Sequence, residues 1–265
     1  MNPLLDAAIA AALAGGDVLR AMMNDMGEVR SKTNEFDVVT DADIAAGVAV
    51  VRAIAERLEG ARFVVEEPEV YSLAGVREGS LDADQVWVID PLDGTTSFVH
   101  GFPCYSTSVA LLSDGQPVVG AVHNVPLHET TFAALGEGAH LNGRRIECGT
   151  TTDLADALVI TGFPYDRGQP LELQMAAFSQ VVRLAEGVRR DGSAAIDCCH
   201  VAAGRADAFW EYGLKPWDMA AGVVALREAG ALVTGVDGEP WTAHSTGIIT
   251  ANPELHQILR DIICE

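Results

Sequence analysis

Residues 87–96, with the sequence WVIDPLDGTT, constrain the fold more strongly than any other part of this chain. The apolar residues at the start of this segment predict a short buried strand that stops at the carboxylate of Asp90. Pro91 has no N–H group for a neighbouring strand, and Gly94 lets main chain come close to a ligand. We therefore expect a mixed α and β protein in which this strand ends in a loop that presents Asp90 and Asp93.

Further acidic residues fall at similar places in the chain. Glu66 and Glu67 end another short apolar run, and Asp218 follows Pro216 at the start of a predicted helix. Taken singly, each acid is better explained by ordinary turn or cap chemistry, with Asp218 as an N-cap and Asp93 in a β-turn. Strand ends and helix starts are where loops build sites, and it is the family resemblance given below that favours one shared site for these acids.

The residues around Gly94 predict a phosphate site. A helix or turn that starts here would offer free N–H groups and a positive dipole end to a phosphate. The carboxylates of Asp90 and Asp93 would repel that phosphate unless cations were bound, and oxygen ligands favour Mg²⁺ over zinc. These acids stand three positions apart. The aspartyl-phosphate mechanism of the haloacid dehalogenase phosphatases needs a shorter spacing, so a metal-activated water is the better hypothesis.

The charge balance restricts the partners of the protein. The 38 Asp and Glu residues and 17 Lys and Arg residues give a formal net charge of -21, which repels nucleic acids and anionic membranes. We therefore expect a small-molecule substrate, with no nucleic-acid and no membrane partner. The five cysteines are odd in number and lack C-x-x-C spacing, as is typical of reduced thiols in a cytoplasmic protein. Asp6 interrupts the apolar N-terminus, which argues against a signal peptide.

The chain is long enough for two closely packed halves. Its 49% of apolar residues is sufficient for a large core. We expect an N-terminal α+β half with the metal-binding loops over residues 1–145, and a C-terminal α/β half over residues 146–265. The second half would close the active site, and together they would form one compact unit.

Local patterns predict the elements of each half. The first half should contain an N-terminal helix capped by Asn2 and a hairpin that turns near Asn34. The spacing of Thr40 and Asp43 predicts a capping box on a helix that ends near Leu58. An antiparallel meander should follow over residues 105–134. Beyond it, from about residue 143, strands and helices should alternate up to a C-terminal helix.

Several motifs are similar to those of the inositol monophosphatase family of Mg²⁺-dependent, lithium-sensitive phosphatases, and the similarity runs essentially from end to end. The longest matches are DPLDGTTSFVHG at 90–101 and WDMAAG at 217–222, followed by EAG at 228–230. Shorter matches are Lys32 with DVVTDAD at 37–43, GSAA at 192–195, and Glu211. The resemblance implies an α+β fold, a layered αβαβα sandwich of the inositol monophosphatase and fructose-1,6-bisphosphatase type, and usually a homodimer.

The resemblance also implies a set of metal ligands. Two or three Mg²⁺ ions would be bound in each site, and Asp90 would bridge the first two. The first ion would be held by Glu66, Asp90 and the carbonyl of Leu92, and the second by Asp90, Asp93 and Asp218. A third and weaker site would lie near Glu66.

The same resemblance assigns the reacting and recognition groups. Its catalytic residues would be Glu66, Asp43 and Thr95, with Thr95 oriented by Asp43 to position the attacking water. The substrate-binding residues would be Asp93, Gly94, Thr95, Gly192, Ser193, Ala194 and Glu211. The amides of Gly94 and Thr95 would cradle the phosphate, whereas Asp93, Ala194 and Glu211 would face the departing alcohol. Lys32 is a further candidate, because the chain contains only one other lysine.

The chain departs from the family pattern at some positions. Val65 stands where the family usually has glycine, and Ser97 replaces an asparagine after the second threonine. Neither change removes a ligand, although both bear on metal affinity. The sequence HNVP at 123–126 also differs from typical members, which leaves the substrate pocket open.

Other reactive residue types are weaker candidates. All seven histidines are interpreted as structural or surface residues because none shows metal-ligand spacing. Arg167, Arg189 and Arg190 could contact a second charge on a substrate, but solvated side chains are the commoner explanation. Cys198 and Cys199 point apart on a predicted helix, so we expect one of them to be buried.

These features lead to one functional hypothesis with alternatives. We expect a Mg²⁺-dependent phosphomonoesterase that hydrolyses a small polyol or sugar phosphate, foremost myo-inositol monophosphate, by in-line attack of a metal-activated water. Fructose-1,6-bisphosphatase and histidinol-phosphatase activities are alternatives on the same fold. A non-catalytic regulatory protein is the alternative from another class. The set of mutually repelling carboxylates argues against it.

Overall fold

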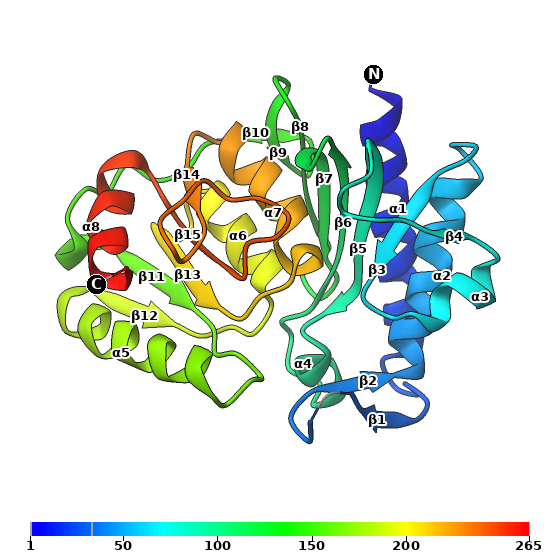
Figure 1. The fold of residues 1–265 in the computed structure, drawn as a ribbon, viewed down its shortest axis with the longest axis horizontal. Helices are drawn as coiled ribbons and strands as arrows, with labels where there is room; N and C mark the ends of the chain where they lie inside the picture. The colour runs from blue at the N-terminus through cyan, green and yellow to red at the C-terminus, as the bar shows by residue number, and fades with distance from the viewer. Residues whose placement is uncertain (1, 33, 265) are drawn as a thin grey trace.

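The computed structural model describes residues 2–32 and 34–264, and its elements stack in five layers of alternating helix and sheet (Figure 1). This arrangement confirms the expected α+β sandwich. Each helical layer packs buried apolar side chains against the sheet beside it. The outer layers are α1 (Pro3–Met22) with α2 (Asp41–Ala55), and α5 (Gln169–Leu184) with α8 (Pro253–Ile263); the central layer is α6 (Ala194–Ala202) with α7 (Pro216–Glu228).

The first sheet has eight strands in the order β10-β9-β8-β7-β6-β5-β3-β4. The strands from β5 to β10 are antiparallel neighbours, which confirms the predicted meander, whereas β3 is parallel to β4 and β5. Their bounds are β3 (Arg62–Val65), β4 (Arg77–Glu78), β5 (Gln85–Asp93), β6 (Ser106–Ser113), β7 (Gln116–Asn124), β8 (Glu129–Ala134), β9 (Gly138–Leu141) and β10 (Arg144–Ile146). The meander is longer than the predicted 105–134, because the β9 and β10 hairpin extends it to Ile146.

The second sheet has five strands in the order β12-β11-β13-β15-β14. In this sheet β11 is parallel to both of its neighbours, and the other pairs are antiparallel. The bounds are β11 (Leu158–Thr161), β12 (Gly187–Arg189), β13 (Ala208–Tyr212), β14 (Leu232–Thr234) and β15 (Gly247–Ala251). The short helix η1 (Leu154–Asp156) leads into it.

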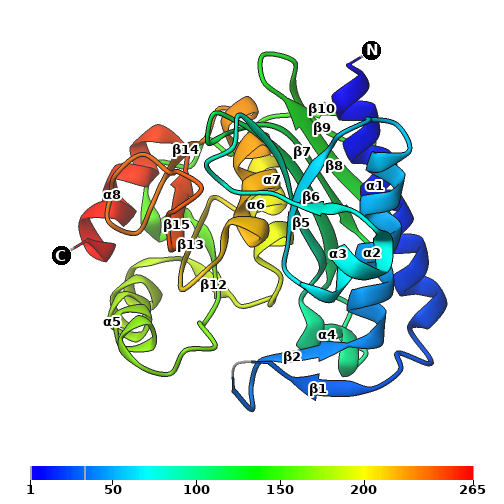
Figure 2. The same ribbon diagram turned by 45° about the vertical axis from the view of Figure 1, so that its right-hand side comes forward.

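The predicted caps and hairpin are present. Asn2 accepts a hydrogen bond from the amide of Leu4 at 3.1 Å, and Thr40 with Asp43 forms the capping box of α2. That helix ends at Ala55, before the predicted Leu58. The hairpin consists of β1 (Val29–Ser31) and β2 (Val38–Thr40), and it lies beside α4 (Thr95–Val99), as Figure 2 shows. Thr33 in the predicted turn, and the chain ends Met1 and Glu265, lie outside the described residues.

Small residues let the central helices pack closely against the first sheet. A Cβ atom at Gly120 of β7 would lie 2.5 Å from the carbonyl oxygen of Ala221 in α7, so only glycine fits there. We expected burial of one of Cys198 and Cys199, and both of these α6 residues are buried in this layer. Opposite faces of α6 are both covered because α6 lies between two sheets.

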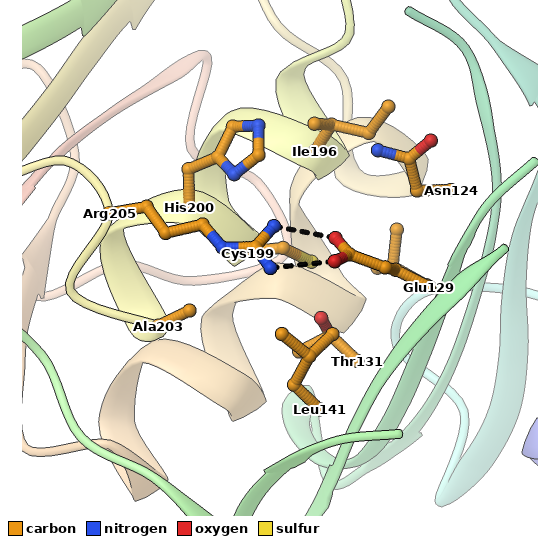
Figure 3. Close-up of a pocket in the computed structure, with 10 residues that line it drawn as sticks. Asn124, Glu129, Thr131, Leu141, Ile196, Cys199, His200, Ala203 and Arg205 are labelled. Carbon is orange, nitrogen blue, oxygen red and sulfur yellow. Dashed lines mark hydrogen bonds and ion pairs between the residues drawn. The ribbon is translucent and has the colours of Figure 1, made fainter. Parts of the chain in front are cut away.

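A small cavity at the other end of α6 is closed by an ion pair. Arg205, in the turn before β13, donates two hydrogen bonds of 2.5 and 2.6 Å to the carboxylate of Glu129 on β8 (Figure 3). The cavity measures about 10 Å³, which is room for about one water molecule. Across the described residues, none of the helices combines the length and apolar character needed to cross a membrane.

Candidate active site

A cavity of about 470 Å³ opens where the ends of β5, β11 and β13 meet the starts of α6 and α7. It draws its walls from both sheets and from the β1 and β2 hairpin. Most of the residues singled out from the sequence line it: Lys32, Glu66, Asp90, Leu92, Asp93, Gly94, Thr95, Gly192, Ala194, Glu211 and Asp218. Asp43 and Ser193 are buried behind its wall, where they hydrogen-bond to Thr95 and Asp93.

A β-bulge directs the acids at the end of β5. Asp90 pairs with Ser108 of β6 and Asp93 pairs with Ser106, so β5 carries one extra residue between these pairs. The hydroxyl of Thr107 donates a hydrogen bond of 3.0 Å to the carbonyl of Pro91 and fixes the bulge. Both carboxylates therefore reach the same cavity although they stand three positions apart.

Gly94 forms a left-handed turn before α4. Its φ angle is 92°, and a Cβ atom there would lie 2.8 Å from the carbonyl oxygen of Cys104. A residue with a side chain would be both strained and crowded at this position. The turn brings the main chain of Gly94 and Thr95 to the cavity wall, as the predicted phosphate cradle requires.

A buried chain of hydrogen bonds orients Thr95. Its hydroxyl oxygen lies 3.0 Å from Asp43 Oδ1 and 3.1 Å from the carbonyl oxygen of Leu92. Asp43 Oδ2 in turn accepts hydrogen bonds from the amide and hydroxyl of Thr40 at 2.8 and 2.6 Å. Burial raises the pKa of Asp43 to about 6, although these hydrogen bonds oppose the shift. The Thr95 hydroxyl is thus held by a carboxyl that can exchange a proton near neutral pH.

The start of α6 holds Asp93. The hydroxyl of Ser193 and the amide of Ala195 donate hydrogen bonds of 2.6 and 2.8 Å to Asp93 Oδ2. Ser106 of the first sheet lies 3.2 Å from the Ser193 hydroxyl, hydroxyl to hydroxyl. The GSAA segment therefore supports an acid from the other half of the chain.

Lys32 on the hairpin joins the pair of acids that follows β3. Its Nζ atom lies 2.7 Å from Glu66 Oε1 and 2.5 Å from Glu67 Oε1. Burial alone would lower the pKa of Lys32, but the two carboxylates outweigh burial and raise it. Burial raises the pKa of Glu67 to about 7, with Lys32 acting in the opposite direction. Glu67 was not assigned a role from the sequence, and it shares the lysine with the predicted ligand Glu66.

The remaining acids repel one another. Burial is the main cause that raises the pKa of Asp90, Asp93 and Asp218, and neighbouring carboxylates add to it. The pKa of Asp93 reaches about 6. Burial also raises the pKa of Glu211 to about 8, with the charge of Asp93 adding and that of Arg190 opposing. Such a cluster is stabilised by protons or by bound cations.

The hydrogen bonds leave room for metal ligation. Asp90 accepts the amide of Leu92 on Oδ1, Asp93 uses Oδ2, and Asp218 accepts the amide of Lys215 on Oδ2. The second oxygen of Asp90 and of Asp218 accepts no hydrogen bond from the described residues, whereas Asp93 also interacts with the amide of Ala194. An all-oxygen donor set of this kind fits Mg²⁺, which keeps several of its own waters. Within the described ranges, no three Asp, Glu, His or Cys side chains already form a metal cage.

Several residues at the cavity were not predicted from the sequence as part of the site. Tyr165 and Lys215 line it, and so does Arg190, for which we had preferred a solvated position. Asp197 on α6 lies close by, fully buried, and neither of its carboxylate oxygens has a hydrogen-bond partner among the described residues. The acid in the apolar run AAIDCC was the available signal for Asp197.

Comparisons with known proteins agree over nearly the whole chain. The inositol monophosphatase family description matches residues 1–265. An inositol-1-monophosphatase of Synechocystis is 39% identical, over 96% of this chain and 86% of the relative. A Nus factor SuhB of Pasteurella multocida is 37% identical, over 96% and 93% of the two chains. The structure of an inositol monophosphatase from Anabaena (Nostoc) superposes with a TM-score of 0.86 at 36% identity, over 98% of this chain and 94% of that one.

Proposed function

This chain belongs to the inositol monophosphatase family, and we propose that it is a Mg²⁺-dependent phosphomonoesterase acting on a small polyol or sugar phosphate, foremost myo-inositol monophosphate. The observation that carries the proposal is the convergence of Asp90, Asp93 and Asp218 on one cavity beside Gly94 and Thr95. These acids come from distant parts of the sequence. Without bound cations, their mutual repulsion would only reduce the stability of the protein.

The proposed ligands are Glu66, Asp90, Asp93, Asp218 and the carbonyl of Leu92. Bound Mg²⁺ would lower the pKa of a coordinated water and neutralise the oxygens of the phosphate. The second carboxylate oxygens of Asp90 and Asp218 support this assignment, because no hydrogen bond from the described residues competes for them.

The other groups of the chain divide the remaining tasks. Thr95, held by Asp43, orients the water that attacks phosphorus. As the Thr95 hydroxyl accepts the proton of that water, Asp43 can take up the hydroxyl proton of Thr95. The amides of Gly94 and Thr95 hold the phosphate. Ala194 and Glu211 face the alcohol that departs on the opposite side, as in-line displacement requires.

Phosphate release tests the proposal directly. The substrates are inositol 1-phosphate, fructose 1,6-bisphosphate and histidinol phosphate, each with Mg²⁺ and with lithium added. We expect the fastest turnover with the inositol ester, no turnover without Mg²⁺, and inhibition by lithium. Faster hydrolysis of fructose 1,6-bisphosphate or histidinol phosphate would assign the chain that activity instead. Release from none of the three, with Mg²⁺ bound, would favour the regulatory role suggested by the name of the Pasteurella relative.

Two further properties belong to the same proposal. We expect a homodimer, which sedimentation would detect, and a cytoplasmic location. The location is supported by the five cysteines, all of which carry free thiols.

A further inference from the structure

We infer that Gly162 is a positioning residue for Glu211, because the missing side chain leaves the space that the Glu211 carboxyl group occupies. The inference rests on the proposed function, in which Glu211 contacts the hydroxyl groups of the leaving polyol. Both residues line the cavity.

The sheet register brings the two positions together. Gly162 directly follows β11, and Glu211 is the fourth residue of β13. The two strands are parallel neighbours, with Thr161 opposite Trp210. The next residue of each strand is therefore Gly162 on one side and Glu211 on the other, and side chains at such paired positions project from the same face.

Space, and not main-chain conformation, requires glycine at this position. A Cβ atom at Gly162 would overlap Cδ, Oε1 and Oε2 of Glu211. The φ angle of Gly162 is outside the left-handed region, so alanine is compatible with the local main chain. An alanine would thus collide with the carboxyl group itself.

The main chain cannot easily move aside. On the opposite face of the sheet, Gln174 Nε2 donates a hydrogen bond of 2.6 Å to Thr161 Oγ1, which donates to the carbonyl of Trp210 at 2.8 Å. The amide of Tyr212 donates to Gln174 Oε1 at 3.1 Å. Thr161 and Gln174 are fully buried, so breaking this network would leave polar groups unpaired. These bonds flank Gly162 and Glu211 and fix the strand ends.

The Glu211 side chain must therefore yield. Its carboxyl group is the far end of a flexible side chain, and rotating it costs less than moving two strands. Gly162→Ala should leave the fold intact and displace the carboxyl from its place in the cavity. The expected defect is in recognition of the substrate and not in stability.

Steady-state kinetics with Mg²⁺ separate these effects. We compare wild type, Gly162→Ala, Glu211→Gln and the double variant on inositol 1-phosphate and on 4-nitrophenyl phosphate, whose leaving group has no polyol hydroxyls. Both single variants should raise KM for the inositol ester about tenfold, as for the loss of one hydrogen bond, with a smaller change in kcat. The double variant should be no worse than either single variant, because both remove the same contact. KM for 4-nitrophenyl phosphate should change less than about twofold.

Gly187→Ala is the matched control. Gly187 lies on β12, the other neighbour of β11, and a Cβ atom there would meet Leu158 at 3.4 Å, an ordinary contact. This variant should leave KM for both substrates unchanged, and both glycine variants should unfold close to the wild-type temperature.

Two results would overturn the inference. One is an unchanged KM for the inositol ester in Gly162→Ala, and the other is additivity of its effect with that of Glu211→Gln. Failure of the proposed function would be recognised separately, because the wild type itself would then release no phosphate from the inositol ester.

Discussion

Acidic side chains at the two cavities of this protein have opposite surroundings. At the small cavity near the end of α6, two hydrogen bonds from the Arg205 guanidinium hold the carboxylate of Glu129 and lower its pKa. At the large cavity, Asp90, Asp93 and Asp218 face one another, and burial with mutual repulsion raises their pKa values. The first group is complete in the folded chain. The second is stabilised only when cations or protons arrive from outside.

The comparison teaches that the partner of an acid at a cavity decides whether that acid stabilises this protein. A bidentate guanidinium satisfies both carboxylate oxygens, so the charge of Glu129 contributes to the fold. A carboxylate with one oxygen engaged and like charges nearby reduces stability, and its presence in a cavity points to ligand binding.

The largest effect is expected from a substitution among the acids of the large cavity. Asp90→Asn removes the proposed bridging ligand, so Mg²⁺-dependent turnover of inositol 1-phosphate should fall by about a thousandfold. In metal-free buffer the same change removes repulsion, so the unfolding temperature should rise. Kinetics and thermal unfolding check the two halves of this prediction. Full activity of the variant would refute the metal assignment.

Asp197 sharpens the comparison. Among the described residues, it is a buried acid that has neither a bound guanidinium, as Glu129 has, nor a place in the wall of the large cavity. Burial raises its pKa well above the ordinary value, the charges of Glu211, Asp191 and Asp93 add to this, and Arg190 opposes it. Asp197→Asn should stabilise the protein at pH 7 by about 1 kcal/mol, because an amide has no charge to bury. Denaturant unfolding measures the change, and a loss of stability at pH 7 would contradict it.

The pH dependence of the Asp197 variant has a fixed sign. A carboxyl group whose folded pKa exceeds its unfolded pKa of about 3.9 lowers stability above that unfolded value. The wild type therefore regains stability from this group as pH falls from neutral toward about 4. The asparagine variant should lack that gain, so the difference in stability between the two proteins should shrink in acid.

The smallest effect is expected at the ion pair. Arg205→Ala removes the guanidinium that binds Glu129. Because the Arg205 side chain is 41% exposed, the loss of folding stability should stay near 1 kcal/mol. Phosphatase activity should be unchanged because the pair lies away from the active-site cavity. Arg205→Lys keeps the charge without the two-pronged geometry and should recover part of the stability. A large loss of turnover in either variant would show that the two regions are coupled.

The sequence indicates the acids of the site better than it indicates their surroundings. Asp90, Asp93 and Gly94 lie within one short segment, where a strand must stop and a turn must follow, so local rules suffice to predict them. Arg190 and Tyr165 reach the cavity because the second sheet and the first are held together across the central helices, and their local sequence carries no sign of this. Asp197 is similar, because its isolation depends on which elements cover α6.

The length of the meander shows the same limit. β9, β10 and β11 are all runs of three or four residues, too short for a clear periodicity, and only tertiary pairing assigns the first two and the third to different sheets. The register of β11 with β13 likewise decides that Gly162 lies next to Glu211.

The contact between Ser106 and Ser193 has a consequence for biosynthesis. Ser106 belongs to the first sheet and Ser193 to the start of α6, and together they support Asp93. A growing polypeptide on the ribosome therefore completes its first sheet long before the helix that steadies this acid has been translated. A truncated product that stops ahead of α6 lacks Glu211 and Asp218 and leaves Asp93 without the Ala195 amide, so premature termination should yield fragments without a complete site.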